Sequence, residues 1–113
     1  MKITHTSLNA THTYEIVDKI PANFFVWNIG ENMAPGYIPI CESTEGYNIN
    51  VTTLKAIALD ENELTILRNA AGYGVNDVKT AKRATKLNPK TRMATTKKEL
   101  AIAALPILER ITA

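Results

Sequence analysis

Basic side chains concentrate in one segment of this chain. Residues 68–98 contain nine Lys and Arg residues and a single acidic residue, Asp77, whereas residues 1–67 contain three basic and eight acidic residues. Dense clusters of cations are typical of proteins that bind polyanions, because they displace condensed counterions from phosphates. The net charge of +2 therefore conceals an acidic front half and a basic segment that favours a nucleic-acid partner.

The basic segment has the spacing of one helical face. Residues at i, i+3, i+4 and i+7 share a face of an α-helix, and four basic residues follow this pattern from position 79. Two more, at positions 90 and 92, extend the charge into the following loop. We expect six side chains to contact phosphates: Lys79, Lys82, Arg83, Lys86, Lys90 and Arg92. The alternative is a solvated surface face, which is common on Lys-rich helices.

Residues 67–83 also bear a loose similarity to a helix-turn-helix motif, in which the basic helix would be the recognition helix. Such a motif needs a small residue, a turn glycine and apolar packing positions. These requirements are met by Ala70, Gly74, Val75 and Val78. The polar residues Asn69 and Thr80 weaken the match. Chance is the alternative explanation of the pattern.

No pattern typical of an enzyme accompanies the basic segment. The glycines around Tyr73 lack the Lys-Ser/Thr pair of a phosphate-binding loop, and a helix end followed by a turn explains them. His5, His12 and Cys41 lack the spacing of metal ligands, and no base is indicated that would activate Cys41. We therefore expect a binding protein rather than an enzyme, with no catalytic residue, cofactor or metal.

Length and composition predict one compact domain. The chain has 113 residues, 45% of them hydrophobic, which is enough for a core. No apolar stretch approaches the roughly 20 residues that cross a bilayer, and the first residues lack the apolar core of a secretory signal. A single cysteine is typical of a reducing compartment. We expect a cytoplasmic protein with a flexible polar arm at 1–12 and an α+β domain at 13–113.

The first half of the chain predicts a small antiparallel β-meander of about three strands. Alternating apolar residues predict a strand over 14–20, which should form a hairpin with the aromatic run at 24–29. A third strand should cover 37–41, at the edge of the sheet because Pro39 cannot donate a backbone hydrogen bond. Residues 50–59 fit either a short helix or a strand.

Three helices should follow the meander. The first begins after Asp60, where Glu63 completes a capping box, and ends at Gly72. The second should run from about residue 76 to 87, and the third from Thr96 along an apolar stripe to residue 111. An isolated small sheet needs a helix to cover it, and we expect the last helix to pack there.

A second hypothesis is that the partner is a protein. Trp27 and Tyr37 lie on predicted strands, and Leu105 lies off the main apolar stripe of the last helix, so all three are candidate interface residues. The acidic sheet face or the last helix would then contact the partner, as in small inhibitors or adaptors of phages and mobile elements. The last helix could also pair with a second copy of the chain. The alternative is that these side chains belong to the core.

Three short blocks in the first half of the chain carry a resemblance. They cover residues 14–21 (YEIVDKIP), 26–30 (VWNIG) and 33–41 (MAPGYIPIC). Together they resemble short uncharacterised bacterial and phage-borne proteins, to which no activity is attached. The resemblance covers roughly a fifth of the chain, excludes the basic segment, and implies an intracellular bacterial or mobile-element setting.

Overall fold

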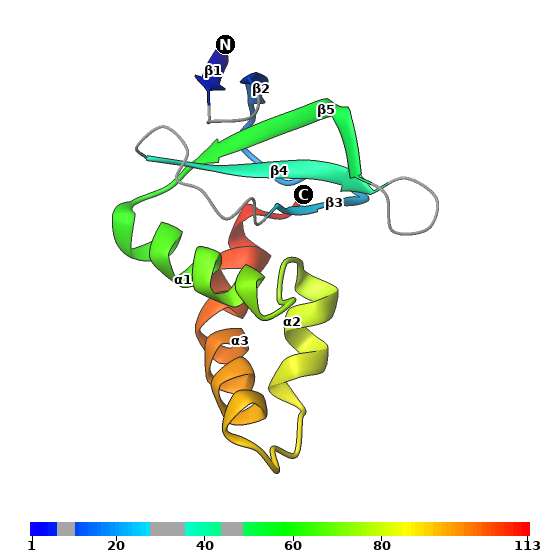
Figure 1. Ribbon diagram of the computed structural model, residues 1–113, viewed down its shortest axis with the longest axis vertical. Coiled ribbons are helices and arrows are strands. Elements are labelled where there is room, and N and C mark those ends of the chain that lie inside the picture. Colours follow the sequence, from blue (N-terminus) through cyan, green and yellow to red (C-terminus); the bar gives the residue numbers. More distant parts are fainter. Residues whose placement is uncertain (7–10, 28–35, 44–48) are drawn as a thin grey trace.

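The computed structural model describes residues 1–6, 11–27, 36–43 and 49–113 (Figure 1). These residues form a five-stranded sheet followed by three helices, which confirms the predicted α+β class. The strands are β1 (Lys2–Thr6), β2 (Thr11–Ile16), β3 (Phe24–Val26), β4 (Tyr37–Ser43) and β5 (Ile49–Ala58). The helices are α1 (Glu61–Gly72), α2 (Val78–Thr85) and α3 (Arg92–Ile111).

The sheet is larger than the predicted three-stranded meander and is mixed. Its strand order is β1-β2-β5-β4-β3, and β2 runs parallel to β5 while the other neighbours are antiparallel. The predicted hairpin between 14–20 and 24–29 is wrong, because β2 pairs with β1 and β5 and β3 pairs with β4. After Ile16 the chain leaves the sheet, and Ile20 forms a bridge with Thr112 at the end of the chain. Residues 28 and 29 of that prediction lie outside the described residues.

Residues 7–10 of the predicted flexible arm at 1–12 lie outside the described residues, whereas residues 2–6 form strand β1. It pairs with β2 in an antiparallel register that places Ile3 opposite the buried Tyr14. On the other face, the hydroxyls of Thr4 and Thr13 lie 3.1 Å apart, and a second threonine pair follows at 3.0 Å. Cross-strand pairs of this kind stabilise a hairpin whose composition is too polar to suggest one.

Pro39 lies in the interior of the sheet, not at its edge as predicted. Its strand, β4, sits between β5 and β3. The Pro39 carbonyl accepts a hydrogen bond of 3.0 Å from the Trp27 backbone N–H. In antiparallel pairing the N–H and C=O of one residue point to the same neighbouring strand, so the N–H that Pro39 lacks would also have pointed toward Trp27. Because β3 ends at Val26, the missing donor falls where regular pairing stops.

Residues 50–58 of the undecided segment belong to strand β5, and residues 54–57 of this strand are covered on both faces. Ile57 packs in the cluster that contains the helices, and the adjacent Ala56 packs with Tyr14 and Cys41 on the opposite face. A strand buried on both faces loses the alternation of apolar and polar residues. Sequence periodicity therefore could not distinguish this strand from a helix.

The helix boundaries follow local capping. Asp60 caps α1 as predicted, accepting from the Glu63 N–H at 2.8 Å, and α1 ends at Gly72. Helix α2 is shorter than the predicted 76–87. The start predicted for α3 at Thr96 is wrong, because Thr91 caps the helix by accepting from the Ala94 N–H at 3.1 Å.

The three helices lie on one side of the sheet (Figure 1). Helix α1 packs on β4, and α3 packs against both α1 and α2. At the end of α3, Leu108 and Ile111 share a buried cluster with Ile38 of β4 and Ile57 of β5, and just beyond the helix the Ala113 N–H donates to the Ile20 carbonyl at 3.0 Å. The sheet is therefore covered by α1 and by the end of α3, rather than by α3 alone. Within the described residues, no helix has the length and apolar character needed to span a membrane.

Candidate nucleic-acid interface

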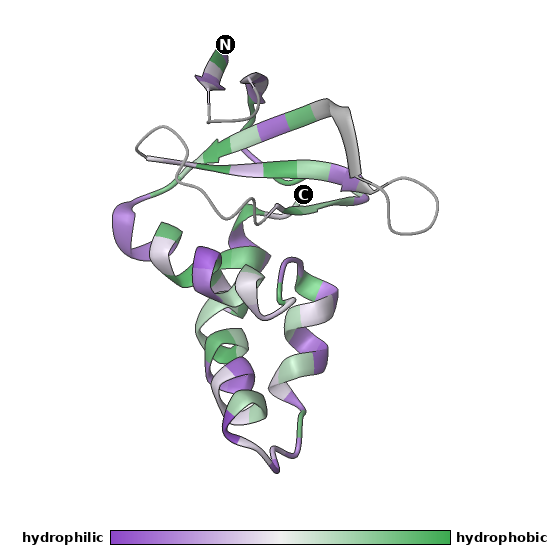
Figure 2. Ribbon diagram, in the orientation of Figure 1, coloured by the Kyte–Doolittle hydropathy of each residue, from purple (hydrophilic) through white to green (hydrophobic). Residues whose placement is uncertain are grey.

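Helix α2 presents its predicted basic residues on one exposed face. Ala81 and Ala84 are buried, and α2 packs against α3. Figure 2 shows the resulting alternation of hydrophilic and hydrophobic residues along α2. The four basic side chains with helical spacing are all exposed: Lys79, Lys82, Arg83 and Lys86.

A capping box determines where this helix begins. Asp77 Oδ1 accepts from the Thr80 N–H at 2.7 Å, and Thr80 Oγ1 accepts from the Asp77 N–H at 3.1 Å. Two otherwise unpaired backbone donors are thereby satisfied at the first turn. Asp77 is also the only carboxylate in the segment 68–98, and it caps the helix instead of pairing with a basic side chain.

The positive charge of α2 is not neutralised by ion pairs among the described residues. Those ion pairs join Lys55 to Glu15, Arg68 to Glu61 and Arg110 to Glu63. None of the three involves a residue of 79–98. Like charges three and four residues apart on a helix repel by roughly a few tenths of a kcal/mol per pair. A bound polyanion would relieve this repulsion.

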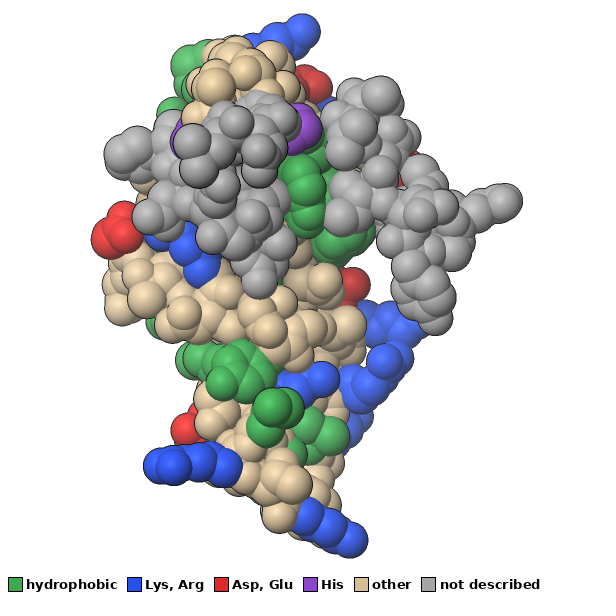
Figure 3. Space-filling view, in the orientation of Figure 1, with side chains coloured by type: hydrophobic (Ala, Val, Ile, Leu, Met, Phe, Trp, Pro, Cys, Tyr) green, Lys and Arg blue, Asp and Glu red, His purple; other side chains and the backbone are tan. Residues whose placement is uncertain are grey.

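The remaining basic residues divide into an exposed and a partly buried group. Lys90 and Arg92 are exposed in the loop between α2 and α3 and at the first residue of α3. Figure 3 shows Lys and Arg side chains along the α2 side of the molecule and around the tip formed by this loop. Lys98 differs, because its Nζ donates to the Leu87 carbonyl at 2.9 Å and ties the end of α2 to α3.

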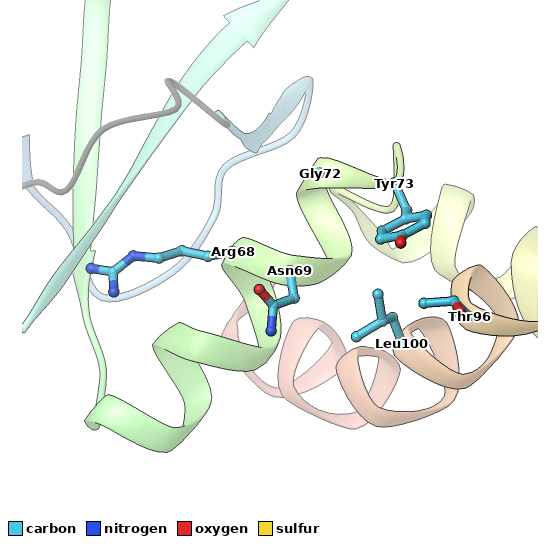
Figure 4. A pocket seen from close by; sticks show the side chains of 6 residues that line it. All are labelled: Arg68, Asn69, Gly72, Tyr73, Thr96 and Leu100. Carbon is cyan, nitrogen blue, oxygen red and sulfur yellow. The ribbon is translucent and has the colours of Figure 1, made fainter. Parts of the chain in front are cut away.

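Two hollows flank the turn between α1 and α2, one on each side. The smaller, of about 130 Å³, lies between α2 and α3 and has Arg83 and Lys97 on its wall. The larger, of about 440 Å³, lies between α1 and α3. It is lined by Arg68, Asn69, Gly72, Tyr73, Thr96 and Leu100 (Figure 4). Sequence analysis missed the larger hollow, although the exposed aromatic between two glycines marks the turn beside it.

The turn between α1 and α2 buries two of the residues named for a helix-turn-helix, while both helices pack mainly against α3. Ala70 and Val75 are buried, and the Val75 N–H donates to the Ala70 carbonyl at 3.0 Å. Gly74 adopts φ +81°, a conformation that favours glycine. Asn69 is exposed and Thr80 forms the capping box, so neither polar residue disturbs the core.

The predicted protein-interface residues are partly buried and lie on two sides of the sheet. Trp27 and Tyr37 pack against the cluster on the face opposite the helices, and the His12 ring meets Trp27 edge-on at 5.8 Å. Leu105 packs against the main core. On α3, Ile102 is instead 55% exposed.

Cys41 and Tyr14 lie in the buried cluster on the sheet face opposite the helices. Cys41 is buried, and burial raises the pKa of its thiol to about 12, so the thiol is protonated at neutral pH. Burial also raises the pKa of Tyr14, with a smaller effect from Cys41. The described part of the chain contains no group of three or more His, Cys, Asp or Glu residues arranged to hold a metal ion.

Comparisons with protein-family models, with curated proteins and with solved structures find no match to this chain.

Proposed function

We propose that this protein binds nucleic acid through the exposed face of α2 and the loop that follows it. The observation that carries the proposal is the shared exposure of Lys79, Lys82, Arg83 and Lys86 without an acidic partner among the described residues. Lys90 and Arg92 extend this surface to the tip of the molecule. Together the six residues form the basic surface discussed below.

The chemistry of the basic surface favours phosphate contacts over base readout. Ammonium and guanidinium groups pair with phosphate oxygens on any sequence, so they supply affinity and orientation rather than sequence discrimination. Each neutralised phosphate of a duplex adds about −0.9 to the slope of log affinity against log salt. Four to six contacts would thus give a slope of roughly −4 to −5.

A salt titration with a matched pair of charge reversals tests the proposal. Binding of generic duplex and single-stranded DNA and RNA is measured by fluorescence anisotropy for wild type, Lys82→Glu and Lys2→Glu. Both lysines are exposed, but Lys2 lies on β1, far from α2 (Figure 1). We expect Lys82→Glu to weaken binding about tenfold or more at low salt and to reduce the slope, whereas Lys2→Glu should have little effect.

Two results would contradict the proposal. The first is the absence of binding to every nucleic acid at low salt. The second is an equal loss of affinity in the two variants, because net charge alone would then explain the binding.

A protein contact through α3 is a second candidate function. Ile102 is exposed and Leu105, one helical turn later, is half-buried, so the two form an apolar strip on the same face. A second copy of the chain or a target of an inhibitor or adaptor could cover this strip. Light scattering over a concentration series tests self-association, which Ile102→Glu should abolish. A monomer at every concentration would leave only the heterologous partner.

A further inference from the structure

The two hollows are lined by neighbouring residues of the same two segments. Tyr73 lines the larger hollow and the next residue, Gly74, lines the smaller. On α3, the neighbouring residues Thr96 and Lys97 divide between the hollows in the same way. A Cβ atom added to Gly74 would lie 4.0 Å from Lys97 Nζ, so the ammonium group lies beside Gly74 in the smaller hollow.

The larger hollow combines an aromatic face with hydrogen-bonding groups. Tyr73 is 39% exposed, and its ring lies across the hollow from Leu100 and Thr96 (Figure 4). Asn69 contributes an amide, which offers both a donor and an acceptor. Aromatic rings stack on nucleobases of any identity, and amides pair with the edges of bases. The volume of about 440 Å³ falls within the usual range of small-ligand sites.

The smaller hollow has the charge that suits a phosphate. Arg83 and Lys97 both line it, and no carboxylate is among its lining residues. Arg83 belongs to the exposed face of α2, so this hollow continues the basic surface toward Tyr73. A cationic hollow next to an aromatic one matches the two halves of a nucleotide.

We propose that the hollow at Tyr73 binds an unpaired nucleobase while Arg83 and Lys97 hold the adjoining backbone phosphate. This inference rests on the proposed function and specifies its ligand as single-stranded nucleic acid. A base inside a duplex is already stacked on both faces, so it cannot enter the hollow without being flipped out of the helix. Stacking on Tyr73 therefore adds affinity for single strands alone.

Two single strands with the same number of phosphates, together with a duplex, separate stacking from phosphate contact. They are a short oligothymidylate, an abasic strand of equal length, and a duplex. We expect wild type to bind the oligothymidylate about tenfold more tightly than the abasic strand, a preference typical of one stacked base. Tyr73→Ala should remove this preference without changing duplex binding, and Tyr73→Phe, which keeps the ring, should retain most of it.

The backbone of the turn should keep its structure when the Tyr73 side chain is replaced. The Tyr73 N–H donates to the Ala70 carbonyl at 3.0 Å, a bond that no side-chain substitution removes. Circular dichroism and duplex binding report whether Tyr73→Ala keeps the native structure. As an independent readout, the added emission of Tyr73→Trp should be quenched by the oligothymidylate and not by the abasic strand.

The outcomes distinguish this inference from the proposed function. Equal affinity for the abasic and thymidine strands, or an unchanged preference in Tyr73→Ala, would overturn base stacking while salt-dependent binding to all three ligands still supported the basic surface. If no ligand binds at low salt, both proposals are wrong. Quenching of Tyr73→Trp by the abasic strand would also count against stacking.

Discussion

Asp77 and Thr80 cap each other's backbone at the first turn of α2. The Asp77 carboxylate accepts from the Thr80 N–H at 2.7 Å, and the Thr80 hydroxyl accepts from the Asp77 N–H at 3.1 Å. Four basic residues follow within the same short helix or at its C-cap. An isolated helix of this length is marginal in water, so its ends and its packing must hold it. By stabilising the first turn of α2, the capping box helps to keep the basic residues on one face of the helix.

Loss of this cap should destabilise the protein through hydrogen bonding rather than charge. We expect Asp77→Ala to lower the free energy of unfolding by about 1 kcal/mol, the usual cost of an N-cap replaced by alanine. Asp77→Asn, which keeps an acceptor oxygen, should cost less. Urea denaturation measures both. An equal loss in the two variants would show that the carboxylate charge matters more than its hydrogen bond.

The start of α3 can be tested by two threonines five residues apart. Thr91 accepts from the Ala94 N–H as the N-cap, whereas the Thr96 hydroxyl donates to the Arg92 carbonyl inside the helix. We expect Thr91→Ala to lower the free energy of unfolding by about 1 kcal/mol and Thr96→Ala to leave it nearly unchanged or slightly raised. Thermal unfolding followed by circular dichroism compares them. The reverse order would place the helix start at the position predicted from sequence.

Leu108 should be among the positions most sensitive to truncation. Its side chain is fully buried in the cluster shared by the sheet and the helices. Leu108→Ala should lower the free energy of unfolding by about 2–5 kcal/mol, because it leaves a cavity. Ile102→Ala, on the same helix but exposed, should change it by about 0.5 kcal/mol or less. Similar effects in both variants would mean that α3 does not pack as described.

Cys41 should make stability fall at alkaline pH. Burial raises the pKa of the folded-state thiol from 9.0 to about 12. Below pH 9 the thiol is protonated in both states, so it adds no pH dependence; above pH 9 the unfolded chain loses the proton first. The free energy of unfolding should therefore decrease from about pH 9 to pH 12. Cys41→Ala should lack this part of the decrease.

A thiol reagent gives a second measurement on the same residue. Because Cys41 is buried and protonated at neutral pH, labelling should be slow in native protein and fast in urea. Rapid labelling of the native state would contradict the burial.

The basic face was predictable from sequence, but the larger hollow was not. The spacing of Lys79, Lys82 and Arg83 determines which helical face they share, and the structure exposes that face. The larger hollow instead joins Tyr73 to Leu100, which lie on elements that meet only when α1 packs on α3. No local pattern indicates such a meeting. The sequence predicted only the helix end and the turn around Tyr73, which lie beside this hollow.

Sequence by itself determined the features that depend on a few neighbouring residues. Asp60 as a helix cap, Gly74 as the turn residue and the alanines that α2 buries all follow from interactions within one or two turns of the chain. Tertiary structure decided the strand order, the interior place of Pro39 and the burial of residues 54–57 of β5 on both faces. These depend on pairing between distant segments, where many registers bury similar apolar area and only the complete packing selects one.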